Sequence, residues 1–173
     1  MTDAIFKVPQ AINEPVLNYA PGSPEKAELK AALKAAHSGH LEIGMTIGGK
    51  TVFSDDKHTI SPPHERHHVI GEFSKGGAQH VEMAIEAALA AKNDWENMSW
   101  HHRAAIFLKA ADLLTGPYRQ KMNAATMLAQ SKNAYQSEID AVAELADFWR
   151  FNVQFMTDLY QNQPFSPRGQ WNR

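Results

Sequence analysis

The segment from residue 134 to residue 160 constrains the fold most strongly, because it predicts a long helix that is apolar around nearly its whole circumference. Its sequence is AYQSEIDAVAELADFWRFNVQFMTDLY. On an α-helix, Ile139 and Val142 lie on one side of this segment, whereas Leu145 and Phe148 lie on others. Such a pattern indicates burial against several neighbouring elements.

An acidic face on the same helix has two interpretations. Asp140, Glu144 and Asp147 are spaced i, i+4 and i+7 and therefore share one face. They form either a solvated acidic stripe or ion-pair partners for Arg150 or Arg103. Alternatively, one of them lies at the edge of a cavity and meets a cation there. The pattern alone leaves both interpretations open.

The amino-terminal part of the chain divides into two regions. Residues 1–22 contain Pro9, Pro15 and Pro21 and predict an extended arm, which must lie on another part of the fold to be ordered. Residues 23–79 are expected to hold a helix, a β-hairpin and an extended connection.

Local signals define the elements of residues 23–79. Ser23 as the N-cap and Pro24 at the first helical position begin a helix that Gly39 ends. From Glu42 onward apolar residues alternate with others, and Gly48-Gly49 precedes a second run of strand-forming residues. This pattern predicts a two-residue hairpin.

The carboxyl-terminal part of the chain has a helical period. Residues 80–163 are expected to form helices, and residues 164–173 an irregular tail containing proline and glycine. The predicted elements are an apolar stripe through Val81, Ile85 and Leu89, a helix from the N-cap Ser99 to Thr115, a helix from Tyr118 to Gln130, and the long helix already described.

The stretch PHERHHVIG, residues 63–71, contains the His-Glu-x-x-His spelling of zinc proteases through His64 and His68. In those enzymes both histidines lie on one helix and share an ion. Here prolines precede the motif and a β-branched run follows it, so the context is extended. The third histidine of the longer motif would fall at position 74, which is Ser74. We therefore predict a polar turn from His64 to His67 and no metal site.

Composition argues against several classes of partner. The chain has 17 basic and 19 acidic residues and a formal net charge of −2, so nothing indicates binding to nucleic acid or to an anionic membrane. No apolar run approaches the roughly 20 residues that span a bilayer. The first residues resemble neither a signal peptide nor a transit peptide, so we expect a cytoplasmic location. The chain has no cysteine, and therefore no thiol nucleophile of its own.

Four stretches are similar to a known family. They resemble the amino-terminal part of the 1-pyrroline-5-carboxylate dehydrogenases, the glutamate-semialdehyde branch of the aldehyde dehydrogenase superfamily. The similarity runs from about Ile5 to Arg173. The stretches are NEPVLNYAPGSPEKAEL (13–29), AIEAALAAKNDW (84–95), HRAAIFLKAADLLTGPYR (102–119) and SKNAYQSEIDAVAELADFWRFN (131–152).

The resemblance implies a fold class. The segment is expected to be mainly α with a small β-hairpin, and to be part of an α/β aldehyde dehydrogenase fold with a Rossmann-like NAD-binding domain when complete. Residues 80–163 would then be the helical amino-terminal part of that domain. A homo-oligomer is implied as well.

The resemblance also implies an activity, the NAD-dependent oxidation of L-glutamate γ-semialdehyde to L-glutamate in proline catabolism, a glutamate-forming step. In that family a cysteine thiolate attacks the aldehyde, hydride passes to the nicotinamide, and a Glu-activated water releases the acid. The corresponding motifs are absent from this sequence. We therefore assign no catalytic, cofactor-binding or metal-binding residue here, and NAD would be bound by parts of the full-length protein outside this chain.

One substrate-binding residue follows from the resemblance. In the family, the Glu of an Ala-Glu-Leu sequence in the long helix projects into the substrate pocket near the substrate's amino group. The matching residue is Glu144, where a carboxylate beside a cationic amine would favour this aldehyde over uncharged ones. Asp140 and Asp147 gain no such role and are expected to be structural.

Two hypotheses of function remain. The chain is either the amino-terminal segment of such a dehydrogenase, inactive alone, or a stand-alone non-catalytic helical module that binds a partner. The apolar circumference of the long helix distinguishes them, because a solitary domain would have to bury that surface by self-association or expose a large patch.

Overall fold

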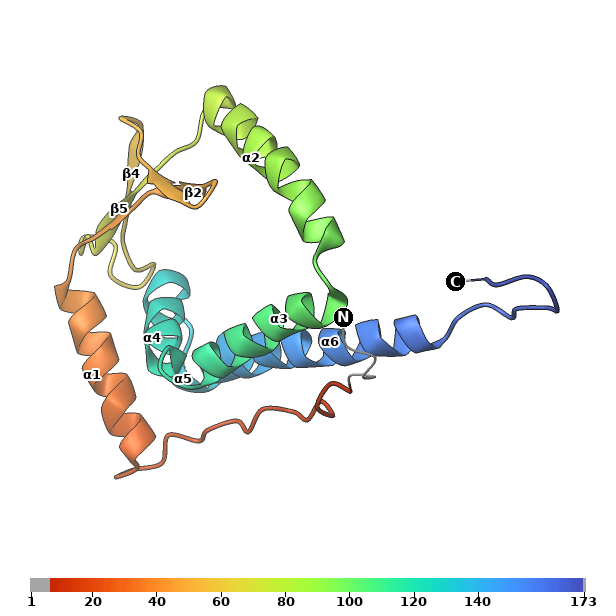
Figure 1. Cartoon of the computed structure of the whole chain (residues 1–173). Coiled ribbons are helices and arrows are strands. Elements are labelled where there is room, and N and C mark those ends of the chain that lie inside the picture. Colours follow the sequence, from red (N-terminus) through yellow and green to blue (C-terminus); the bar gives the residue numbers. More distant parts are fainter. Residues whose placement is uncertain (1–6, 173) are drawn as a thin grey trace.

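The computed structural model describes residues 7–172, and helices dominate it (Figure 1). The first six residues of the predicted arm lie outside the described residues, as does Arg173, the last residue of the predicted tail. Between these limits the chain forms an open arrangement, in which the helices α3 (Trp100–Thr115) and α6 (Glu144–Gln161) lie side by side (Figure 1).

The helices begin and end where the local signals indicate. Ser23 caps the first helix by accepting a hydrogen bond from the Lys26 amide (3.3 Å), and Ser99 precedes the third helix, as predicted. The helices are α1 (Pro24–Ser38), α2 (Ala78–Asn97), α3 (Trp100–Thr115), α4 (Arg119–Gln130), α5 (Ala134–Ser137) and α6 (Glu144–Gln161).

The long helix predicted from residue 134 to residue 160 is not uniform. Between α5 and α6 the chain makes a π-helical turn, η1 (Glu138–Ala143), so the helical run continues with a wider turn in its first half. Such turns insert a residue into an α-helix and occur often at functional sites. Glu144, the residue predicted to bind substrate, is the first residue of α6.

The β structure is larger than predicted. The expected hairpin is confirmed, with the Gly48-Gly49 turn at φ values of 56° and 76°, which glycine adopts without strain. The predicted extended connection instead contains two strands, and residues 41–43 leave the hairpin to join them in a sheet of order β1-β5-β4. The strands are β1 (Leu41–Ile43), β2 (Met45–Ile47), β3 (Lys50–Val52), β4 (Lys57–Ile60) and β5 (Gly71–Ser74).

Two small apolar cores hold the helices together. In the first, Ala111 and Leu114 of α3 pack on Val142 and Ala146 of the long helical run. The second lies between α1 and α4, where Tyr19, Leu29 and Ala124 are buried. Tyr19 belongs to the arm, so the arm is part of this core.

The apolar stripe predicted through Val81, Ile85 and Leu89 is present on α2, but no described element covers it. These side chains are 57%, 54% and 65% exposed, respectively. α2 stands apart from the other helices (Figure 1). Among residues 7–172, no helix is long and apolar enough to cross a bilayer.

Candidate functional site

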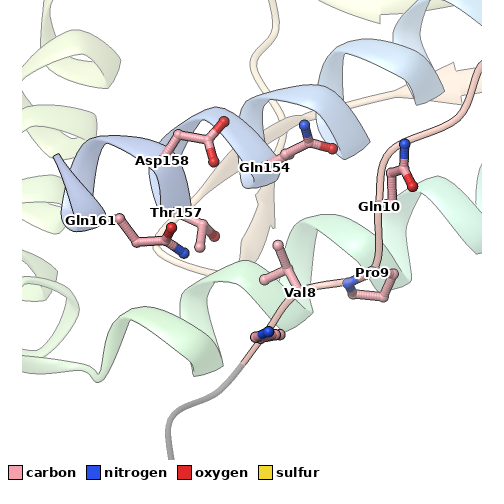
Figure 2. Close-up of a pocket in the computed structure, with 8 residues that line it drawn as sticks. Val8, Pro9, Gln10, Gln154, Thr157, Asp158 and Gln161 are labelled. Atoms are coloured by element: carbon pink, nitrogen blue, oxygen red, sulfur yellow. The ribbon is translucent and has the colours of Figure 1, made fainter.

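The amino-terminal arm lies along the helical run formed by η1 and α6. The described part of the arm starts beside the carboxyl-terminal half of α6, where Val8, Gln10 and Gln154 line a pocket of about 360 Å³ (Figure 2). Three backbone amides of the arm donate hydrogen bonds to side chains of the run. The pairs are Ala11 with Gln154 Oε1 (2.8 Å), Glu14 with Asp147 Oδ1 (2.7 Å) and Leu17 with Glu138 Oε1 (3.0 Å).

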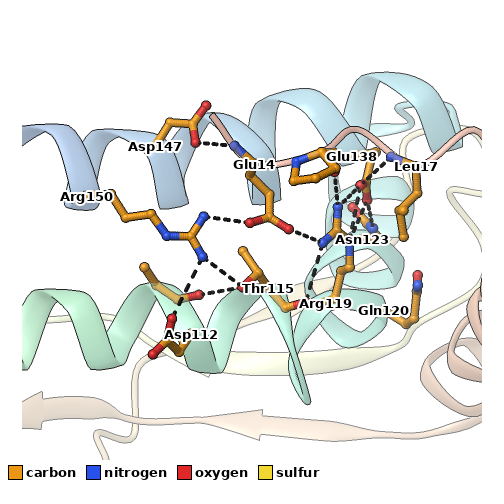
Figure 3. Close-up of polar contacts among 12 residues, drawn as sticks. Glu14, Leu17, Asp112, Thr115, Arg119, Gln120, Asn123, Glu138, Asp147 and Arg150 are labelled. Atoms are coloured by element: carbon orange, nitrogen blue, oxygen red, sulfur yellow. Dashed lines mark hydrogen bonds and ion pairs between the residues drawn. The ribbon is translucent and has the colours of Figure 1, made fainter. Parts of the chain in front are cut away.

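Glu14 of the arm bridges two arginines from different helices (Figure 3). Its Oε1 accepts from Arg119 Nη1 and its Oε2 from Arg150 Nη1, both at 2.6 Å. Arg119 also donates to the Pro15 carbonyl at 2.7 Å. All three charged side chains are largely shielded from solvent, so this ion-pair network fixes the arm more firmly than exposed pairs would.

Glu138 is the buried centre of the same network, with 0% of its surface exposed. Arg119 donates to both of its carboxylate oxygens, and Oε2 also accepts from Tyr19 Oη (2.6 Å) and Asn123 Nδ2 (2.8 Å). Burial raises the pKa of the Glu138 carboxyl, but hydrogen bonds from Arg119, Tyr19, the Leu17 amide and Asn123 outweigh it and hold the pKa below its usual value.

Tyr19 takes an unusual backbone conformation to reach this carboxylate. Its φ of 52° lies in the left-handed region, which is unfavourable for a residue with a side chain. Burial, together with the hydrogen bond to Glu138, raises the pKa of the Tyr19 hydroxyl well above its usual value. The hydroxyl therefore stays protonated and donates to Glu138.

Sequence reasoning missed this network. Glu138 lies within the long helix predicted from the sequence, and nothing in helical spacing distinguishes a buried glutamate from an exposed one. Three prolines in the arm did indicate a segment that must lie on another part of the fold, but they did not identify Glu14 or its partners.

The three carboxylates predicted to share a face have separate environments. Asp140 forms an exposed ion pair with Lys132 (2.5 Å). Asp147 accepts hydrogen bonds from the Glu14 amide and from Asn13 Nδ2, both at 2.7 Å. Its partners are therefore residues of the arm and not an arginine side chain. Both therefore have structural partners, whereas Glu144 faces a groove.

This groove, of about 580 Å³, is lined by the arm and by the helical run near the junction of η1 and α6. Glu144 lines it together with the aromatic side chains of Phe148, Phe151 and Phe155. Within residues 7–172, the exposed Glu144 carboxylate makes no hydrogen bond or ion pair. A free carboxylate beside aromatic faces can bind an organic cation by charge and by cation–π attraction.

The histidine motif forms the turn that the sequence predicts. Residues 63–67 make turns between β4 and β5, with the Glu65 amide donating to the Pro62 carbonyl and the His68 amide to the Glu65 carbonyl, both at 2.9 Å. His64 Nδ1 lies 2.8 Å from Ser131 Oγ, next to the end of α4. The zinc-protease arrangement, with its histidines on one helix, is therefore not formed by this motif.

Comparison with known proteins relates this arrangement to one family. The family model described as "Aldehyde dehydrogenase family" matches residues 53–172. A delta-1-pyrroline-5-carboxylate dehydrogenase from Agaricus bisporus is 49% identical over 98% of this chain and 32% of its own length. The mitochondrial human protein of that name is 42% identical over 89% of this chain and 27% of its length. The chain thus spans about a third of the length of these relatives.

A solved structure agrees with these matches. The delta-pyrroline-5-carboxylate dehydrogenase from Mycobacterium tuberculosis, in a structure bound with NAD, has a TM-score of 0.96 and 45% sequence identity. The match covers 99% of this chain and 32% of that one, so the mainly helical architecture with its small sheets is part of a larger fold, as expected. On the family match and this likeness together, the chain belongs to the aldehyde dehydrogenase family.

Proposed function

We propose that this chain is the amino-terminal segment of an NAD-dependent delta-1-pyrroline-5-carboxylate dehydrogenase, which oxidises L-glutamate γ-semialdehyde to L-glutamate in proline catabolism. The observation that carries the proposal is the 49% identity to a relative of that name along 98% of this chain. Within the whole protein, this segment would help to form the substrate pocket, while the reacting groups come from elsewhere.

Glu144 is the residue of this segment that we assign to the substrate. Its carboxylate faces the groove and has no partner among residues 7–172, so it is available to a cation. The semialdehyde carries an ammonium group at one end and the reacting aldehyde at the other. Binding of the ammonium by Glu144 would orient the aldehyde without Glu144 taking part in bond making.

The chain contributes no assigned contact to NAD. Its glycines include no G-x-G-x-x-G spacing of the kind that approaches a pyrophosphate, and it contains no cysteine to act as nucleophile. We therefore assign no cofactor contact and no catalytic step to residues of this segment.

Activity of the complete polypeptide tests this proposal. We expect the complete polypeptide to form NADH when supplied with NAD and L-glutamate γ-semialdehyde. The purified 173-residue chain serves as the control and should form none. Failure of the complete polypeptide to oxidise the semialdehyde, or turnover by the pure 173-residue chain, would refute the proposal.

The stand-alone module remains the second candidate, favoured by the apolar side chains that α2 leaves exposed. Such a module would have to cover this face with a partner or with a second copy. If the dehydrogenase proposal is right, the rest of the polypeptide covers it. Amide exchange along α2 should then be slower in the complete polypeptide than in the 173-residue chain.

We further propose that the complete protein is a homo-oligomer without a nucleic acid or membrane partner, and that it is cytoplasmic. The balanced charge supports the absence of a nucleic acid or membrane partner. For the location, the relative from Emericella nidulans is named as mitochondrial, so fluorescence imaging of the tagged complete protein is the deciding measurement. Light scattering on the purified protein gives the oligomeric state.

A further inference from the structure

Three potential metal ligands from distant parts of the sequence meet beside the end of α1. His37, Glu65 and His68 each offer one ligand atom, and these atoms lie within 4.8 Å of one another. We propose that they bind one divalent transition metal ion of the zinc type, with water completing the coordination. This site is separate from the groove of Glu144 and does not depend on the dehydrogenase proposal.

The hydrogen bonding of His68 prepares one of its ring nitrogens for a metal. Its Nε2 lies 2.7 Å from the His37 backbone carbonyl, which can only accept a hydrogen bond. Nε2 therefore carries the hydrogen of this contact, which leaves Nδ1 as the ring nitrogen that can bind a metal. A ring hydrogen donated to a backbone carbonyl is the usual way in which proteins orient a metal-binding histidine.

His37 and Glu65 supply the other two ligands. His37 Nε2 lies 2.7 Å from Glu65 Oε2, close enough to share a hydrogen. A metal ion takes the place of that hydrogen, which moves to Nδ1 of the ring. Glu65 then supplies a carboxylate oxygen to the same ion, which is a common zinc ligand.

The geometry of the three side chains suits a small coordination sphere. The rings of His37 and His68 are stacked, with centroids 4.1 Å apart and planes 15° from parallel. Tetrahedral ligands about 2.1 Å from Zn²⁺ lie about 3.4 Å from one another. The ligand atoms are within 4.8 Å, and the His37 and Glu65 side chains are 42% and 47% exposed, so they can close around an ion without moving a packed core.

The local electrostatics also favour a cation. His37 lies in the last turn of α1, where the aligned peptide dipoles give the helix end a partial negative charge. One imidazole pair and one carboxylate match the ligands that zinc prefers over magnesium. A bound ion would join α1 to the connection between β4 and β5, two elements that contact each other here through side chains.

The structural site and the sequence motif use different ligands. The motif would bind an ion through His64 and His68, whereas the structure places His37, Glu65 and His68 together and His64 beside Ser131. Substituting His37 or His64 therefore distinguishes a site built by the fold from a motif match.

Calorimetric titration of the purified chain with ZnCl₂ tests the proposal. We expect a strongest class of sites of one ion per chain and no heat with MgCl₂. In a parallel nitrogen NMR measurement of the histidine rings, the His68 Nδ1 signal should shift on zinc addition while its Nε2 keeps the hydrogen.

Four variants complete the test, each first checked for native circular dichroism. His37→Ala, Glu65→Gln and His68→Ala should each weaken zinc binding at least tenfold. The matched control His64→Ala, from the same turn, should bind zinc as the unmodified chain does. Unchanged binding by His37→Ala, loss of binding by His64→Ala, or an unshifted His68 Nδ1 signal would overturn the proposal. The NMR measurement uses the unmodified chain, so it tests the proposal even if a variant fails to fold.

Discussion

Glu138 shows how one buried charge can organise a segment of chain far from it in sequence. Its carboxylate accepts hydrogen bonds from Arg119 on α4, from Asn123 on the same helix, and from Tyr19 and the Leu17 amide on the arm. A buried carboxylate without such partners would be strongly unfavourable. The arm and α4 must therefore be in place for Glu138 to be buried.

Removing the charge of Glu138 should destabilise the fold. Glu138→Gln keeps the shape but leaves the Arg119 guanidinium with Glu14 as its remaining charged partner. Breaking a buried pair in this way costs roughly 3 kcal/mol, which we expect in the free energy of unfolding measured by urea denaturation. The matched control is Asp140→Asn, whose exposed pair with Lys132 should contribute less than about 1 kcal/mol. Equal losses for the two variants would contradict this assignment.

Glu138 should also make stability depend on pH in the acid range. Its pKa is lower in the folded protein than the ordinary value of 4.5, so its contribution is present above that value. It is lost as the pH falls through the lower, folded pKa. The difference in unfolding free energy between the unmodified chain and Glu138→Gln should therefore shrink from neutral pH to about pH 3. A difference that stays constant over this range would show that Glu138 is not ionised in the folded state.

At the scale of elements, the arm depends on side chains rather than on a backbone ladder. Amides of Ala11, Glu14 and Leu17 all donate to side-chain oxygens of the η1–α6 run. Each bond can thus be removed by a single substitution that leaves the helices intact. The arm differs in this respect from a β-strand, whose amides donate to backbone carbonyls of the neighbouring strand.

Asp147→Ala should release one part of the arm. The change removes the acceptor of the Glu14 amide and of Asn13 Nδ2. We expect faster hydrogen exchange at the Glu14 amide, measured by NMR, because the amide loses its hydrogen-bond acceptor. Exchange in α3 should stay unchanged, and the control Asp140→Asn should leave the Glu14 amide protected. Unchanged exchange at Glu14 would mean that other contacts hold the arm.

The helices could be predicted from the sequence because their signals are local. Ser23, Pro24 and Gly39 mark the ends of α1, and Ser99 and Gly116 flank α3, all within a few residues of the boundary. Capping and proline geometry act over that range, so no knowledge of the tertiary structure is needed.

The sheet and the π-helical turn could not be predicted in the same way. Strand β1 pairs in parallel with β5, about thirty residues away, and Gly71 is needed there because a Cβ would lie 2.4 Å from the Leu41 carbonyl oxygen. The turn η1 coincides with the burial of Glu138, which depends on Arg119 and Tyr19. Both features are set by contacts between distant residues, which periodicity does not report.

At the scale of the whole molecule, the chain has a well-packed part and an uncovered part. The arm, α1, α3, α4 and α6 enclose two apolar cores, whereas α2 leaves Val81, Ile85 and Leu89 open. The relatives are about three times as long as this chain. We infer that the remaining sequence of a complete protein packs on α2, which explains why an apolar stripe predicted from the sequence lacks a partner here.

We infer that the remaining sequence of a complete protein also adds walls to the groove. In this chain the groove is lined by the arm and by the helical run, and the Glu144 carboxylate that lines it has no partner among residues 7–172. Our proposal for the substrate depends on that carboxylate meeting an ammonium group once the other walls are present. Glu144 could be predicted as the substrate-binding residue only through the family resemblance, because helical spacing alone does not distinguish it from Asp140 and Asp147.

The proposed binding of the substrate's ammonium group by Glu144 is tested most directly by steady-state kinetics of Glu144→Gln in the complete polypeptide. We expect KM for L-glutamate γ-semialdehyde to rise about tenfold, since a charge-assisted hydrogen bond to the ammonium is lost, while KM for an uncharged aldehyde of similar length changes little. Asp140→Asn, on the same helical run, is the control and should leave both KM values unchanged. Equal changes of KM for the charged and the uncharged aldehyde would show that Glu144 does not bind the substrate's ammonium group.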